Sequence, residues 1–102
     1  MPDKKVLNKI IEVILQVVTP DKIILFGSQA RGDAREDSDY DILVVKSDID
    51  ERNLAKKIYR KLVDVDACVD VIVKTPENLE KSKNNLGSII RYVLKEGIVI
   101  YG

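Results

Sequence analysis

Two short segments of the sequence carry residues suited to phosphate and metal chemistry. The first is Gly27-Ser28, which directly follows the apolar run of residues 22–26 and has Arg31 three residues later. A strand that ends in Gly-Ser and turns into a helix presents backbone amides and the positive end of a helix dipole, which both attract phosphate. Gly27 allows close approach, the Ser28 hydroxyl adds a donor, and Arg31 can add a guanidinium. This segment predicts a phosphate-binding turn.

The second segment is Asp39-Tyr40-Asp41, at the start of another apolar run. Residues i and i+2 of a strand project from the same face with backbones about 7 Å apart. Two carboxylates at ~4 Å would repel by about 4 kcal/mol at an effective dielectric of 20, and Mg²⁺, which prefers oxygen ligands, would remove that repulsion. Asp70, on a later apolar strand, can supply a third carboxylate to a site with two metal ions. Asp66, on the same predicted face, is the alternative.

The surrounding pattern predicts the elements that would hold these residues. Apolar residues at helical spacing indicate a helix over 4–18 with Asp3 as its N-cap. We expect a strand over 22–26, a short helix from Ser28, and a strand over 39–45 that directs Tyr40 away from the aspartates. Asp48 and Glu51 have the spacing of a capping box for a helix to about residue 62.

The second half of the chain predicts a strand over 65–73 and two further helices. Thr75-Pro76-Glu77 is typical of an N-cap followed by proline at the first helical position. The last helix is expected to be ended by Gly97 and followed by a strand over 98–101. Its predicted apolar face consists of Leu86, Ile89, Ile90, Val93 and Leu94. The order α-β-α-β-α-β-α-α-β indicates an α/β or α+β domain with a sheet flanked by helices.

Composition excludes several classes of protein. The 102 residues are 45% apolar and suit a single domain over 1–102. The absence of histidine excludes Ser-His-Asp and Cys-His catalysis. One cysteine excludes internal disulfides and favours the cytoplasm, and we expect Cys68 to be a buried, inert thiol. A net charge of zero argues against direct nucleic-acid binding. No apolar stretch is long enough for a membrane span, and the start lacks the layout of a signal peptide.

Several of these charged residues also suit purely structural roles. Arg31 could instead form a surface salt bridge with Asp33. Asp70 could be a charge that protects an edge strand from aggregation. The basic residues at helical spacing in 52–61 indicate a solvated helix face, with a partner surface as the lesser interpretation.

Taken together, these segments resemble the polymerase-beta-type nucleotidyltransferases. Gly-Ser followed after ten residues by Asp-x-Asp is similar to the signature of that superfamily, and the fuller segments 27–33 and 38–41 resemble its minimal nucleotidyltransferase branch. Further resemblance runs through residues 69–77 and 96–102. It implies a nucleotidyltransferase fold with a mixed sheet of about four strands.

The resemblance also implies roles for the residues. Gly27 and Ser28 would hold the β- and γ-phosphates of ATP, and Arg31 matches a basic position of the motif. Asp39 and Asp41 would bind two Mg²⁺ ions. Asp70 would bind the catalytic ion and help to deprotonate the acceptor hydroxyl, which attacks the α-phosphorus and releases pyrophosphate.

Members of this branch commonly pair with a helical HEPN protein. The resemblance therefore implies a toxin–antitoxin role in which AMP is transferred to a tyrosine of a HEPN-type partner, within a homo- or hetero-oligomer. Because the chain is short, we expect that partner to complete the substrate site. Two alternatives stay open: an antitoxin that neutralises its partner by binding alone, and an enzyme that modifies a small hydroxylated molecule.

Overall fold

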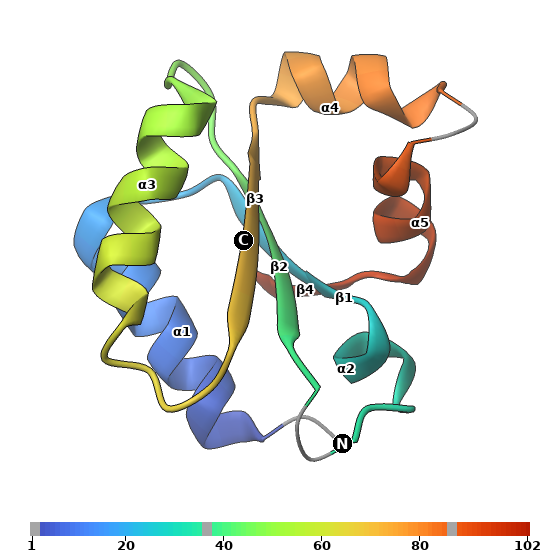
Figure 1. Ribbon diagram of the computed structural model, residues 1–102. Coiled ribbons are helices and arrows are strands. Elements are labelled where there is room, and N and C mark those ends of the chain that lie inside the picture. Colours follow the sequence, from blue (N-terminus) through green and yellow to red (C-terminus); the bar gives the residue numbers. More distant parts are fainter. Residues whose placement is uncertain (1–2, 36–37, 86–87) are drawn as a thin grey trace.

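The computed structural model describes residues 3–35, 38–85 and 88–102. Within that part of the chain, nine elements follow the predicted order (Figure 1). They are α1 (Lys4–Val17), β1 (Lys22–Phe26), α2 (Ser28–Arg31), β2 (Tyr40–Val45), α3 (Glu51–Leu62), β3 (Val69–Lys74), α4 (Pro76–Lys83), α5 (Ile89–Glu96) and β4 (Ile98–Tyr101). The predicted class, a mixed sheet flanked by helices, is confirmed.

The four strands form one sheet in the order β3-β2-β1-β4. β1 is antiparallel to both β2 and β4, whereas β2 and β3 are parallel. A parallel pair needs a long crossover, and α3 supplies it between β2 and β3. The register of that pair places Asp41 opposite Asp70, which brings two of the three predicted carboxylates together.

Helices cover the two faces of the sheet unequally (Figure 1). α1 and α3 pack on one face and form the larger core with the inward residues of the strands. Tyr40 belongs to this core, and its hydroxyl accepts a hydrogen bond from the Asp3 backbone amide at 3.2 Å. The prediction that Tyr40 faces away from the aspartates is confirmed. On the other face, Ile90 and Val93 of α5 pack against Phe26 and Leu43 in a smaller core.

Two predicted helix starts are confirmed. The Asp3 side chain caps α1 by accepting from the Lys5 amide at 2.8 Å. Thr75 caps α4 by accepting from the Asn78 amide at 3.2 Å, with Pro76 in the first turn. In both cases a side-chain oxygen satisfies one of the amides that have no partner within the helix.

The predicted capping box of α3 is wrong. Asp50, not Asp48, is the N-cap, and it accepts from the Asn53 amide at 3.1 Å. Asp48 adopts a positive φ of 59° in the preceding turn. Glu51 accepts instead from the Thr75 amide at 2.8 Å, because that amide lies beyond the end of β3 and needs a partner. Glu51 thus joins α3 to the start of α4.

The predicted strand over 65–73 begins four residues later than expected. The Val65 amide donates to the Leu62 carbonyl at 2.9 Å, so the chain is still turning after α3. β3 begins only at Val69, where pairing with β2 starts. Asp66 therefore lies before β3, and the prediction that it shares a strand face with Asp70 is wrong.

The predicted apolar face of α5 is only half right. Ile90 and Val93 are buried, but Ile89 is 54% and Leu94 43% exposed. Leu86 lies outside the described residues. A helix of two turns can bury only a narrow stripe against a sheet, and here the stripe is set by Ile90 and Val93. Gly97 ends α5 as predicted.

No helix in the described ranges is both long enough and apolar enough to cross a membrane.

Candidate active site

The turn from β1 into α2 is built around Gly27, which has φ 75° and ψ −157°. This backbone conformation is essentially restricted to glycine. A Cβ atom at this position would lie 2.2 Å from the Asp41 Oδ2 atom. The absence of a side chain therefore lets the start of α2 and the Asp41 carboxylate share the same small space, so the two predicted motifs meet there.

The carboxylates are arranged along the start of β2 and β3. Asp41 pairs with Phe26 on one side and with Asp70 on the other. Neighbouring strands lie about 4.8 Å apart, so Asp41 and Asp70 project from the same sheet face. Asp39 precedes β2 and is exposed, as is Asp70, while Asp41 is half-buried. The structure thus brings Asp41 and Asp70 together and leaves Asp39 two residues upstream of Asp41.

Two hydrogen bonds hold the backbone around Asp39. The buried Gln29 side chain of α2 donates to the Ser38 carbonyl at 3.3 Å. The Tyr40 amide donates to the Cys68 carbonyl at 2.9 Å. Asp39 is therefore fixed between α2 and the start of β3. Sequence reasoning missed the role of Gln29, since a glutamine between Ser28 and Ala30 gives no sign of its burial.

Arg31 forms two ion pairs on this side of the sheet. Its Nε atom lies 3.3 Å from Asp33 Oδ2, and its NH1 atom lies 3.3 Å from Glu96 Oε2. These hydrogen bonds, first that with Asp33, raise the pKa of Arg31 above its usual value. The predicted salt bridge between Arg31 and Asp33 is thus confirmed. The same guanidinium also lines the pocket described next.

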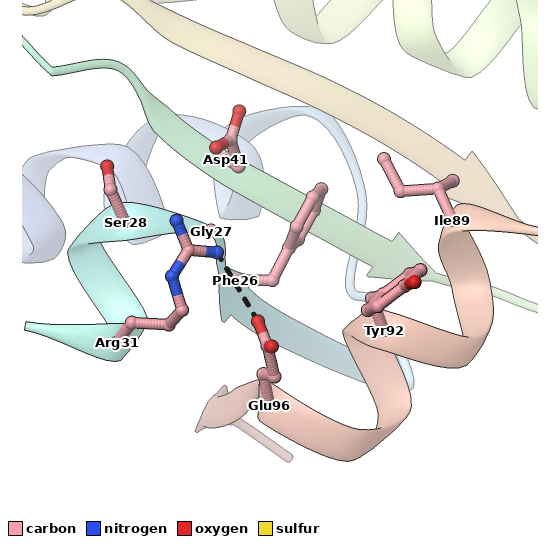
Figure 2. A pocket seen from close by; sticks show the side chains of 8 residues that line it. All are labelled: Phe26, Gly27, Ser28, Arg31, Asp41, Ile89, Tyr92 and Glu96. Carbon is pink, nitrogen blue, oxygen red and sulfur yellow. Dashed lines mark hydrogen bonds and ion pairs between the residues drawn. The ribbon is translucent and has the colours of Figure 1, made fainter. Parts of the chain in front are cut away.

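A pocket of about 550 Å³ lies between α2, the start of β2 and α5. Figure 2 shows Ser28, Arg31 and Asp41 at one end and Ile89 and Tyr92 at the other, with the Phe26 ring between them. Its lining residues are Phe26, Gly27, Ser28, Arg31, Asp41, Ile89, Tyr92 and Glu96. The volume falls within the range of about 300–1,000 Å³ that is typical of small-molecule sites.

The pKa of Asp41 is raised above its ordinary value. Burial of the carboxyl is the main cause, followed by the negative charges of Asp70 and Asp39, and Arg31 opposes the shift. The charged form of Asp41 is thus penalised in the folded chain. A cation bound between these carboxylates would relieve the repulsion, and an all-oxygen donor set fits Mg²⁺.

The raised pKa of Asp41 predicts a pH-dependent cost to stability. The folded chain binds the Asp41 proton more tightly than the unfolded chain, so stability falls as the pH rises from the ordinary aspartate range through the raised pKa. Asp41→Asn should therefore raise the melting temperature at pH 7 without divalent ions, and the gain should shrink towards pH 4. Thermal unfolding from pH 4 to pH 8 checks this, with the exposed Asp64→Asn as control; equal shifts in both variants would contradict it.

The described residues include no group of three or more acidic or cysteine side chains already arranged to hold a metal ion. Asp41 and Asp70 are adjacent, but Asp39 lies before the strand and is exposed. The metal-binding roles of Asp39, Asp41 and Asp70 stay predictions.

The sequence and the fold were compared with known proteins. Residues 8–102 match the family model described as "Polymerase beta, Nucleotidyltransferase". The chain belongs to this family. A Methanocaldococcus jannaschii protein that carries the name protein adenylyltransferase MJ0604 is 42% identical over 80 residues, which cover 78% of this chain and 77% of the relative.

Solved structures also resemble this nucleotidyltransferase. One is a toxin–antitoxin crystal structure with AMP-PNP, at 25% identity and a TM-score of 0.68, covering 93% of this chain and 72% of the other. Another is the tri-AMPylated HEPN toxin of Shewanella oneidensis in complex with its MNT antitoxin. There the identity is 20% and the TM-score 0.63, over 97% of this chain and 71% of the other, which supports the shared fold.

Two residues that the sequence analysis singled out, Asp66 and Cys68, lie away from the pocket lined by Ser28 and Tyr92. Asp66 and Cys68 line a second hollow with Tyr40 and Gln29. Cys68 is exposed, so its prediction as a buried thiol is wrong. The reason is the late start of β3, which leaves Cys68 in the approach to the strand rather than within the sheet.

The α5 residues of the pocket were missed by sequence reasoning. Ile89, Tyr92 and Glu96 are spaced i, i+3 and i+7, which places them on one face of a helix. That spacing was readable in the sequence. The sequence does not show that this face meets the Gly27–Ser28 turn, because that contact depends on how α5 docks on β1.

Proposed function

We propose that this nucleotidyltransferase transfers AMP from ATP to a hydroxyl group of a protein acceptor. The observation that carries the proposal is the register of Asp41 with Asp70, together with the position of Asp41 beside the Gly27 turn, with which it lines one pocket. The name of the Methanocaldococcus relative supports a protein as acceptor. The AMP-PNP structure, at 25% identity, supports an adenine nucleotide as donor.

In the proposed reaction, the acceptor oxygen attacks the α-phosphorus of ATP. The bond from that phosphorus to the bridging oxygen breaks, and pyrophosphate leaves. The Gly27–Ser28 turn would hold the β- and γ-phosphates through backbone amides and the Ser28 hydroxyl. Arg31 would add positive charge to the same phosphates once a nucleotide competes with Asp33 and Glu96 for its guanidinium.

Asp39, Asp41 and Asp70 are the residues that would hold Mg²⁺. The ions would neutralise charge on the phosphates and lower the pKa of the acceptor hydroxyl. The residues fit this role because their side chains offer oxygen ligands alone. Burial first, and then the negative charges of Asp70 and Asp39, raise the pKa of Asp41, and a bound cation would offset this cost. Asp70 is exposed beside Asp41, so its carboxylate would act as the base that removes the proton from the attacking hydroxyl group.

We propose that the acceptor is a tyrosine of a HEPN-type partner and that both proteins act in the cytoplasm as an antitoxin and its toxin. The pairing of MNT and HEPN chains in the Shewanella complex motivates this partner. The single cysteine, which leaves no internal disulfide to form, is compatible with a reducing compartment.

The test is to incubate the chain and a HEPN-type protein from the same genome with ATP and Mg²⁺, and to measure intact masses. We expect the partner to gain mass in multiples of AMP, at a tyrosine identified by peptide mapping. Neutralisation of the toxin without any mass gain, and equally by the Asp39→Ala/Asp41→Ala double variant, would favour the binding-only antitoxin. Modification of a small hydroxylated compound without the partner would favour that acceptor class.

A further inference from the structure

We propose that Tyr92 and Ile89 of α5 form the platform on which the nucleobase lies. This inference rests on the proposed function, because it places the base of the same nucleotide whose phosphates bind at Gly27 and Ser28. It assigns to α5 a ligand class, a flat aromatic ring attached to a polyanion. The platform would stack against any base and would favour no particular hydrogen-bonding edge.

The pocket has the polarity that such a ligand needs. Gly27, Ser28 and Arg31 supply amides, a hydroxyl and a guanidinium at one end, whereas Ile89 and Tyr92 supply apolar surface at the other (Figure 2). A nucleoside triphosphate has the same division between a charged tail and a flat apolar ring. The buried Phe26 side chain forms the floor between the two ends.

Tyr92 and Ile89 do not anchor α5 on the sheet, and their apolar side chains remain exposed. Tyr92 is 64% and Ile89 54% exposed, while Ile90 and Val93 anchor the helix in the smaller core. Exposed apolar surface rimmed by polar groups is typical of ligand-binding grooves. Here the rim consists of Arg31 and Glu96, which also line the pocket.

α5 is anchored by the buried side chains of Ile90 and Val93 in the smaller core, and this packing does not depend on Arg31. At its end, Gly97 fits so closely that a Cβ atom there would lie 2.4 Å from the Val93 carbonyl oxygen and 2.5 Å from Ile24 Cγ2. The distance between the platform and the phosphate-binding turn is therefore set by the packing of α5 on β1.

The test compares the Mg²⁺-dependent binding of ATP with that of inorganic tripolyphosphate, by calorimetry on the full chain. Tyr92→Ala should weaken ATP binding at least about fivefold, since stacking of a base on an aromatic side chain is worth about 1–3 kcal/mol. Tripolyphosphate has no base, so its affinity should stay within about twofold. Tyr92→Phe keeps the ring and should bind ATP like the unaltered chain.

Leu94→Ala is the matched control, because Leu94 is an exposed apolar residue of the same helix that does not line the pocket. It should change neither affinity. ATP binding that survives Tyr92→Ala, or an equal loss for both ligands, would overturn the platform while leaving the proposed function intact. AMP attached to Tyr92 itself would also overturn it. If the unaltered chain bound neither ligand, the proposed function would fail first and the platform with it.

Discussion

Replacing Asp41 with asparagine is expected to lower the rate of nucleotidyl transfer by about a thousandfold. Asp41 is the carboxylate that touches both parts of the site: it contacts the Gly27 turn and pairs in register with Asp70. Metal ions at such a site supply several kcal/mol of charge stabilisation, and each 1.36 kcal/mol corresponds to about a tenfold change in rate. Asparagine keeps the shape of the side chain but removes the charge that would hold the ion.

The measurement is the rate at which AMP is incorporated into the partner protein, with Asp64→Asn as control. Asp64 is an exposed aspartate in the turn after α3, so its amide variant should retain full activity. The expected stability gain of Asp41→Asn at neutral pH, caused by the raised pKa of Asp41, separates loss of chemistry from loss of folding. If the variant kept activity within about tenfold of the unaltered chain, Asp41 would not be a catalytic residue.

Replacing Gly27 with alanine is expected to lower transfer by about a hundredfold and to destabilise the chain. The new Cβ atom would lie 2.2 Å from Asp41 Oδ2 and 3.2 Å from its Cγ atom, so either the turn or the carboxylate must move. A displacement of about 1 Å in an active site can cost about 100-fold in rate. The backbone conformation adds about 1–3 kcal/mol of strain for a residue with a side chain.

Gly32→Ala is the matched control for this variant. Gly32 ends α2 with φ 86°, yet among the residues that the structure describes, and apart from its own helix and chain neighbours, no atom lies within 4 Å of the position that a Cβ atom would take. Its alanine variant should lose about 1–2 kcal/mol of stability but keep its activity below the melting temperature. The two variants are compared by chemical unfolding and by the transfer assay. Similar activity in both would mean that the contact between Gly27 and Asp41 does not matter for the reaction.

The local features of the fold were predictable because short stretches of sequence determine them. Apolar periodicity and the caps Asp3 and Thr75 placed α1 and α4 correctly. The start of α3 was misplaced because Asp48 and Asp50 are both suitable caps by type. The turn decides between them, since Asp48 takes a positive φ and Asp50 precedes the first helical residue.

The candidate site was predictable to the extent that its motifs are local. Gly27, Ser28 and Asp41 line one pocket, and the register of Asp41 with Asp70 follows from two apolar strands that run in parallel. The contribution of α5 was not predictable, because the helical pattern assigned Ile89 to the core. Only the packing of Ile90 and Val93 on the sheet shows that Ile89 and Tyr92 face the pocket.

The ion pair between Arg31 and Glu96 joins residues that are 65 positions apart in the chain. One wall of the pocket comes from the β1–α2 turn and the start of β2, and the other comes from α5. The pocket therefore forms only after these segments, which are distant in sequence, have packed together. A partly folded chain in which α5 is detached would keep the Gly27–Ser28 turn but would lack the wall that α5 provides. Binding of a ligand that contacts both walls would then select the completed fold and stabilise it by mass action.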